Sequence, residues 1–275
     1  MTTTVTLNDG TTIPSIGFGT YPHDNDDSAA NTEHALEIGY RLIDTALSYE
    51  NEEEVGEGIR RSPVAREELV VTTKVPGRFH GYDGARESFE TSAKSLGLET
   101  VDLLLIHWPL PRLDKYVDTW RALIDLQQEG RVRSIGVSNF TPDHIRRLQD
   151  ETGVTPAVNQ VELHPYFQQR EQRAFHAEHG IVTEAWSPLG RGGDLLQEPR
   201  ILEVADALGV SAGQVVLRWH LQQGIVPIPK SKTPSRQREN FDVFGFELSE
   251  AQIASIDELE RDRIWGQDPN TYEEF

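Results

Sequence analysis

Residues 102–108 read DLLLIHW and residues 68–74 read ELVVTTK. Both are short, nearly continuous apolar runs, which indicate strands that are buried on both faces of a parallel sheet. Similar β-rich runs alternate with helical stretches along the rest of the chain. We expect the other strands at 16–20, 41–46, 134–139, 157–162, 181–187 and 225–230, and helices at about 28–39, 51–60, 84–96, 115–129, 142–150, 169–179, 199–208 and 211–223. This alternation predicts an α/β fold of the (β/α)8 TIM barrel type.

Three further features bear on the architecture. The opening TVTLNDGTTIP (4–14) predicts an N-terminal β-hairpin outside the barrel, because its Asp-Gly pair favours the φ > 0 conformation of a tight turn. A doubly wound open sheet is the rival architecture, but the segment GFGTYP (17–22) has only the first two glycines of GxGxxG, and Asp44 lies beyond the place of a ribose-binding carboxylate. No Gly/Ser tract, Pro-rich run or block of like charge marks a linker, so we expect a single domain over 1–275.

The composition excludes several classes of function. Acidic residues number 45 against 26 basic ones, giving a net charge of −19, and such a surface repels nucleic acid and anionic membranes. No basic start leads into an apolar run, and no membrane-length stretch of about 18 apolar residues occurs, so we expect a cytoplasmic protein. Because there is no cysteine, disulfides, thiolate metal sites and cysteine nucleophiles are ruled out.

The few lysines are themselves informative. The chain has only Lys74, Lys94, Lys115, Lys230 and Lys232, and the acidic, lysine-poor surface resembles that of proteins from salt-loving archaea. An ordinary acidic cytosolic protein is the alternative; the halophilic interpretation predicts that activity persists in concentrated salt. No large apolar patch stands out beyond the barrel pattern, so we expect a monomer.

Four polar residues lie at or just beyond the ends of successive expected strands: Asp44, Tyr49, Lys74 and His107. The active site of a barrel lies at the C-terminal ends of its strands, so these side chains can converge there. A buried tyrosine beside a lysine, a carboxylate and a histidine can act as an acid near neutral pH. Singly, each could be a turn cap, a surface aromatic, a solvated strand end or a core histidine. Their joint occurrence favours a catalytic site.

Three strings around these positions resemble the aldo-keto reductase family. They are DTALSYENEEEVGEGI (44–59), VDLLLIHWP (101–109) and IPKSKTPSRQREN (228–240). The resemblance covers almost the whole chain, and it is closest to the short prokaryotic members such as 2,5-diketo-gluconate reductases. It implies a barrel oxidoreductase that reduces carbonyl groups with NADPH and without a metal.

The resemblance also implies a role for each of the four residues. Tyr49 would be the general acid that protonates the carbonyl oxygen as hydride arrives at the carbon. The ammonium of Lys74 would lower the pKa of this phenol from its ordinary value near 10, and Asp44 would keep Lys74 charged. His107, expected to be neutral, would hydrogen-bond the substrate oxygen and orient it.

The residues implied to hold NADPH follow the later strands. Ser138, Asn139 and Gln160 match the positions that hold the nicotinamide carboxamide, and Trp186 matches the ring on which nicotinamide stacks. Helix caps and a core tryptophan are the structural alternatives. Clustered basic residues in an otherwise acidic chain indicate an anion site after the last strand, and a guanidinium at Arg236 favours NADPH over NADH. The remaining cofactor positions are Gly19 and Thr20 near the first strand, Ser187, Leu189 and Gly190 at the pyrophosphate, and Lys230, Ser231, Lys232, Thr233, Glu239 and Asn240 at the adenosine end.

The resemblance places Tyr21, Trp108 and Trp265 around the substrate, beside Tyr49 and His107. The short segment PLPRLD (109–114) and the short C-terminal tail indicate a small or open pocket for aldehydes, ketoaldehydes or small keto-sugars. Two other functions remain open at this point: a binding or regulatory barrel, and a barrel lyase or isomerase acting on sugar phosphates. The latter would bind sugar phosphates without any change in NADPH absorbance.

Overall fold

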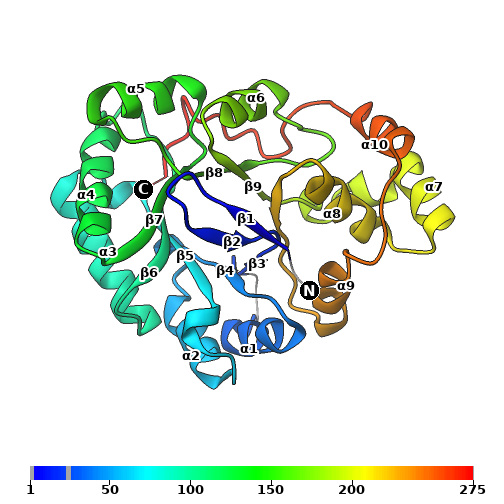
Figure 1. The fold of residues 1–275 in the computed structure, drawn as a ribbon, viewed down its shortest axis with the longest axis horizontal. Coiled ribbons are helices and arrows are strands. Elements are labelled where there is room, and N and C mark those ends of the chain that lie inside the picture. The colour runs from blue at the N-terminus through cyan, green and yellow to red at the C-terminus, as the bar shows by residue number, and fades with distance from the viewer. Residues whose placement is uncertain (1–2, 23–25, 275) are drawn as a thin grey trace.

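A computed structural model describes residues 3–22 and 26–274 of the chain. Eight parallel strands run in sequence order around a barrel, and helices surround them (Figure 1). The (β/α)8 prediction is thus confirmed. The strands are β3 (Phe18–Gly19), β4 (Leu42–Asp44), β5 (Val70–Val75), β6 (Val101–Ile106), β7 (Val132–Ser138), β8 (Val158–Glu162), β9 (Val182–Trp186) and β10 (Val226–Ile228).

The barrel closes between its first and last strands by backbone hydrogen bonds. The N–H of Gly17 donates to Pro227 O at 3.1 Å, and that of Gly19 donates to Pro229 O at 3.0 Å. Proline has no N–H, so residues 227 and 229 can only accept at this seam, and both flanking strands are much shorter than expected. A Cβ at Gly17 would lie 2.6 Å from Cδ1 of Ile228 and 2.9 Å from Cγ of Leu42, so a larger residue here would displace packed side chains of β10 and β4.

The outer layer contains the eight expected helices and two more. The expected ones agree with the predicted ranges to within about two residues at each end. The additional helices are α9 and α10, which follow the last strand. The ten helices are α1 (Ser28–Ile38), α2 (Glu52–Arg61), α3 (Tyr82–Leu96), α4 (Tyr116–Gln128), α5 (Pro142–Thr152), α6 (Arg170–Glu178), α7 (Pro199–Leu208), α8 (Ala212–Gln222), α9 (Pro234–Phe241) and α10 (Glu250–Asp257). Within the described ranges, no helix combines the length and apolar character that crossing a membrane would need.

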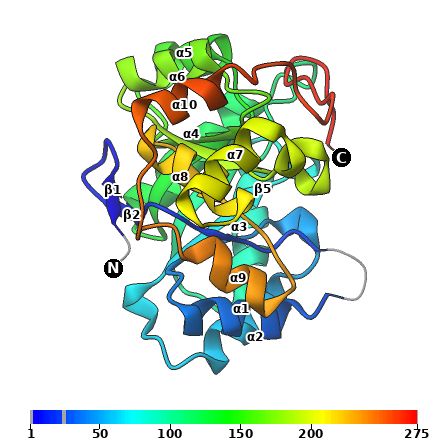
Figure 2. The ribbon, with the colours of Figure 1, turned by 90° about the vertical axis from the view of Figure 1, so that its right-hand side faces the viewer.

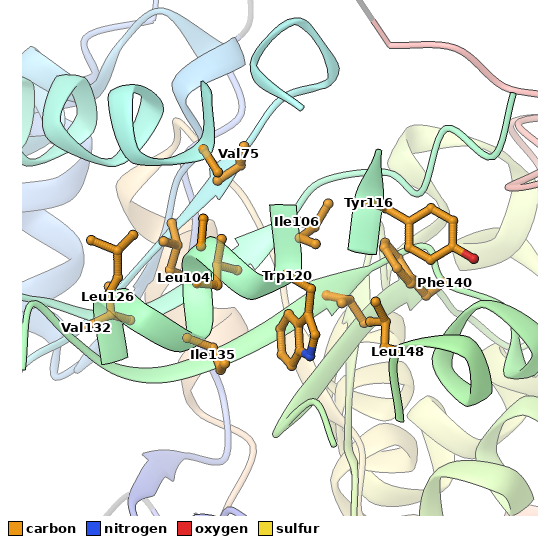
Figure 3. Packing of buried hydrophobic residues seen from close by; sticks show 14 of the residues in the cluster. Val75, Leu104, Ile106, Tyr116, Trp120, Leu126, Val132, Ile135, Phe140 and Leu148 are labelled. Atoms are coloured by element: carbon orange, nitrogen blue, oxygen red, sulfur yellow. The ribbon is translucent and has the colours of Figure 1, made fainter. Parts of the chain in front are cut away.

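Apolar side chains pack the strands against the surrounding helices. Figure 3 shows side chains of β6 and β7, among them Leu104 and Ile135, facing Trp120 and Leu126 of α4. These side chains are at most 2% exposed. Burying such side chains is worth roughly 1.5–3 kcal/mol each. This packing holds β6 and β7 against α4, and it therefore also fixes the position of the residues that follow these two strands.

The two ends of the barrel differ. The hairpin strands β1 (Thr4–Thr6) and β2 (Thr12–Pro14) pair as expected, and Gly10 in their turn has φ 85°. The hairpin contacts the starts of later strands, with Thr11 Oγ1 2.7 Å from the Oγ of Ser134. Figure 2 shows it at one end of the barrel, with the C-terminal tail at the opposite end. The tail therefore lies on the side where the strands finish.

Candidate active site

A buried ion pair joins the ends of β4 and β5. The ammonium nitrogen of Lys74 lies 2.9 and 2.8 Å from the two carboxylate oxygens of Asp44, and it donates to the carbonyl of Thr45 at 2.9 Å. Lys74 and Asp44 are 1% and 4% exposed. Burial alone would lower the pKa of Lys74, but the charge of Asp44 raises it above its usual value. Lys74 therefore stays charged at neutral pH.

Tyr49 lies beside this pair at the end of a 3-10 turn, η1 (Leu47–Tyr49). Lys74 Nζ donates to its hydroxyl at 3.4 Å. Burial raises the pKa of Tyr49 to about 12; Lys74 lowers it, while Asp44 and Glu274 raise it further. The expected effect of Lys74 is present, but the expected net lowering is wrong for this structure, because burial outweighs it. The phenol is consequently protonated at neutral pH.

His107 follows β6 directly and faces the same point. Its ring centroid lies 5.8 Å from that of Tyr49, and its backbone N–H donates to Val75 O at 3.0 Å. The ring nitrogen Nδ1 is 3.2 Å from the hydroxyl of Ser48 and 2.7 Å from the carboxylate of Glu274. The four residues expected from the sequence thus converge, and a fifth group, Glu274, joins them.

The expected nicotinamide residues lie at the neighbouring strand ends. Asn139 adopts a left-handed conformation, with φ 63°, and its amide nitrogen donates to His107 O and to the Oγ of Ser138, both at 3.0 Å. Its amide oxygen accepts from the indole N–H of Trp186 at 2.8 Å. The next helix, α5, is capped by Thr141. Ser138 and Asn139 are therefore not helix caps, and their side chains turn toward the end of the barrel.

Gln160 on β8 connects the ion pair to a second buried carboxylate. Its amide nitrogen donates to Asp44 at 2.8 Å and to Glu184 on β9 at 2.9 Å. Glu184 is fully buried; burial, and then the charge of Asp44, raise its pKa to about 7, although Gln160 and Lys74 oppose the shift. The barrel end thus holds one ammonium beside two carboxylates.

The loop after β9 turns sharply past the site. Ser187 and Gly190 both have positive φ, of 51° and 65°, and the Gly190 N–H donates to Ser187 O at 3.0 Å. Leu189 packs against the apolar residues beneath the loop. This anchoring fixes the loop backbone near Trp186, where the pyrophosphate cradle is expected.

Aromatic rings border the space in front of Tyr49. The ring of Tyr21 meets that of Tyr49 edge-on at 5.1 Å. The guanidinium of Arg191 lies 4.7 Å from the Tyr21 ring centroid and 4.4 Å from that of Trp265. The guanidinium of Arg191 therefore links Tyr21 and Trp265, and this residue was not expected at the site.

The residues expected at the adenosine end lie around the start of α9. The ammonium of Lys230 pairs with Asp26, and Gly19 approaches closely enough that a Cβ there would lie 3.6 Å from the Cβ of Lys230. Thr20, by contrast, donates its hydroxyl to Asp44 O at 3.0 Å, so it contacts the end of β4.

The start of α9 offers backbone donors and basic side chains together. Thr233 is the N-cap of α9 but makes no side-chain cap hydrogen bond, and its own N–H donates to Ser231 Oγ at 3.0 Å. Lys232 and Arg236 are exposed on this turn. Two further expected positions, exposed Glu239 and buried Asn240, lie on α9 opposite Gly213 of α8.

The C-terminal tail covers part of the strand ends. Tyr272 packs on Trp108 with ring centroids 4.4 Å apart, so Trp108 is only 5% exposed. Residues 267–270 of the tail, together with Trp186, help to line a cavity of about 150 Å³. The tail therefore bounds this side of the barrel end, and the small or open substrate pocket stays a prediction.

Three residues that contribute to the site were not predicted. Glu184 lies two residues before Trp186 in a mostly apolar strand. A charged residue within such a strand is a sequence signal that could have identified it. Arg191 directly follows the expected pyrophosphate loop. Glu274 carried no signal, because nothing in the local sequence indicates that a residue 167 positions beyond His107 folds back onto it.

The chain matches the aldo/keto reductase family model over residues 15–261, and it belongs to this family of oxidoreductases. It is 55% identical to 2,5-diketo-D-gluconic acid reductase B of Corynebacterium sp. (strain SHS752001), over 99% of this chain and 98% of that protein. It is 45% identical to methylglyoxal reductase DkgA of Escherichia coli (strain K12), over 98% of each. The crystal structure of a Gox0644 mutant in complex with NADPH superposes with a TM-score of 0.95, at 45% identity over 99% of each chain.

Glu184 should make stability depend on pH. Its pKa near 7 in the folded state exceeds the unfolded value of about 4.3, so the folded protein binds the extra proton between these values. Its contribution to the free energy of unfolding is thus complete below about pH 4 and is lost as the pH rises through 7. Glu184→Gln should remove this contribution, which is on the order of 3 kcal/mol.

Urea unfolding between pH 5 and 8.5 measures this effect, since the wild type should lose stability relative to Glu184→Gln as the pH rises. Glu178→Gln on α6 is the matched control. Parallel curves for wild type and Glu184→Gln would show that Glu184 does not titrate in this range.

Proposed function

We propose that this protein reduces the carbonyl group of small aldehydes, ketoaldehydes or keto-sugars to an alcohol, with NADPH as the reductant and Tyr49 as the general acid. The observation that carries the proposal is the hydrogen bond from the buried Lys74 ammonium to the Tyr49 hydroxyl, beside His107. When bound, NADPH supplies a hydride to the carbonyl carbon.

Tyr49 then donates the proton to the carbonyl oxygen. Its pKa near 12 keeps the proton on the phenol until negative charge develops on the carbonyl oxygen. As the proton leaves, the phenolate gains the full attraction of Lys74, which Asp44 holds within hydrogen-bonding distance. We expect His107 to hold the carbonyl oxygen toward Tyr49, because orienting the reacting group reduces the barrier without any change of protonation.

The chain's residues fit the cofactor at both of its ends. The site provides the amide and hydroxyl of Asn139 and Ser138 next to Trp186, and this arrangement suits a carboxamide and a flat ring. At the other end, Lys232 and Arg236 flank the uncapped start of α9, where backbone N–H groups and basic side chains favour a phosphate. Among the described residues, no cluster of side chains suited to a metal ion occurs, and the proposed reaction uses none.

The substrate class rests on the pocket and on the relatives. The ring of Tyr21 meets that of Tyr49 and the segment PLPRLD (109–114) is short, so we expect a short substrate and not a steroid-sized one. Relatives that match nearly the full chain are named for reducing 2,5-diketo-D-gluconic acid and methylglyoxal. We propose carbonyl compounds of similar size for this protein.

We also retain the proposals that the protein is a cytoplasmic monomer from a salt-adapted cell. Salt adaptation rests on the net charge of −19 and on the scarcity of lysine, the cytoplasmic location on the lack of a membrane-length apolar run in the sequence, and the monomeric state on the lack of a large apolar patch beyond the barrel pattern. A densely carboxylated surface repels nucleic acid and anionic membranes, so we expect neither as a partner.

Tyr49→Phe removes the proton donor and keeps the ring, so it should reduce kcat for methylglyoxal by at least about 100-fold. Loss of NADPH absorbance measures turnover, and fluorescence quenching on NADPH addition confirms that the variant still binds cofactor. Tyr82→Phe, on exposed α3, is the matched control. If wild type binds NADPH tightly but turns over no carbonyl compound, a binding or regulatory barrel replaces the proposal.

Arg236→Leu should weaken NADPH far more than NADH, because only NADPH carries the 2′-phosphate that a guanidinium can grip. We expect the Km for NADPH to rise about tenfold and that for NADH to change less than twofold. Arg200→Leu on α7 controls for loss of a surface charge. An equal rise for both cofactors would place Arg236 outside the phosphate site.

A further inference from the structure

The carboxylate of Glu274 is a fixed part of the space in front of Tyr49. It lies 2.7 Å from Nδ1 of His107, and the side chain is only 14% exposed. Burial alone would raise the pKa of Glu274, but the neighbouring His107 lowers it below its usual value. A buried carboxylate that stays ionised therefore lies against the residue expected to hold the substrate oxygen.

The tail that carries Glu274 is seated on the barrel at several points. Tyr272 packs on Trp108, and Glu273 lies 3.6 Å from Arg112. At Gly77 the fit is so close that a Cβ would lie 1.9 Å from the backbone oxygen of Glu274. The position of the carboxylate is thus set by packing, and not by its contact with His107 alone.

Its negative charge acts on the reacting group. Glu274 raises the pKa of Tyr49, so its field reaches the proposed proton donor. One carboxylate oxygen, Oε2, is buried without a hydrogen-bond partner among the described residues. The other oxygen contacts His107, and an ionised carboxylate in such a shielded site interacts strongly with a second charge brought near it.

Apart from His107, the two basic side chains near Tyr49 have other partners. Lys74 is already paired with both oxygens of Asp44. The guanidinium of Arg191 lies over the rings of Tyr21 and Trp265. A substrate that carries a carboxylate close to its carbonyl group would therefore meet Glu274 first.

We propose that Glu274 is a specificity-determining residue, which makes the site favour uncharged carbonyl substrates over those that carry a carboxylate near the reacting carbon. The inference rests on the proposed function, since it concerns which carbonyl compounds Tyr49 protonates. Repulsion between the carboxylates of Glu274 and of the substrate discriminates between substrates, and it leaves the hydride and proton transfers that they share unaltered.

The experiment compares two aldehydes that differ in charge, glyoxylate and its ethyl ester, in which the carboxyl group is bonded directly to the reacting carbon. The acid-to-ester ratio of kcat/KM with NADPH should be low in wild type and should rise about tenfold in Glu274→Gln. Glu273→Gln, which changes a charge in the same tail but away from His107, should leave the ratio unchanged. A ratio that moves less than twofold in Glu274→Gln, or equal gains for both aldehydes, would overturn the inference.

Gly77→Ala tests the same inference without altering any charge, because the added methyl group must displace the tail. It should shift the ratio in the same direction as Glu274→Gln. Benzoate binding in the presence of NADPH, followed by tryptophan fluorescence, gives a readout without turnover, and it should tighten in both variants. Wild type that reduces neither the ester nor methylglyoxal would contradict the proposed function, whereas good turnover with an unchanged ratio and unchanged benzoate binding would contradict this inference alone.

Discussion

The ion pair between Lys74 and Asp44 is the interaction on which the rest of the site depends. Two charges removed from water are stable only when their geometry is good and their remaining hydrogen-bonding groups are satisfied. Here Lys74 contacts both Asp44 oxygens, the Thr45 carbonyl and the Tyr49 hydroxyl, and Gln160 donates to Asp44. These groups come from β4, β5, η1 and the more distant strand β8, so the network is complete only when the barrel has assembled.

The same network brings several interacting charges together at this end of the barrel. One ammonium is shared between Asp44, Tyr49 and, more distantly, Glu184, and the negative charge of Glu274 is added from the tail. Burial favours the neutral forms of Tyr49 and Glu184, whereas Asp44 and Lys74 hold each other charged. This balance suits the proposed reaction, in which the phenol keeps its proton until a carbonyl oxygen takes it and Lys74 then stabilises the phenolate.

The sequence allowed much of this to be predicted, because apolar runs end where the barrel needs its polar residues. Asp44, Lys74 and His107 could be placed at strand ends from such runs, and the resemblance to a family added Tyr49 and the cofactor positions. Quantities set by long-range packing could not be predicted. The pKa of Tyr49 depends on burial by the whole barrel end, and the contact of Glu274 with His107 depends on a tail with no local pattern. The pairing of Lys230 with Asp26 likewise depends on loops far apart in sequence.

Replacing Lys74 by Met tests the dependence of the chemistry on this ion pair, since Met fills the volume and removes the charge. We expect the variant to bind NADPH with near wild-type affinity and to lose at least about 100-fold in kcat for methylglyoxal. Its stability should also fall by about 3–5 kcal/mol, because Asp44 is left buried without its partner. A folded Lys74→Met protein that reduces methylglyoxal within tenfold of the wild-type rate would contradict the account.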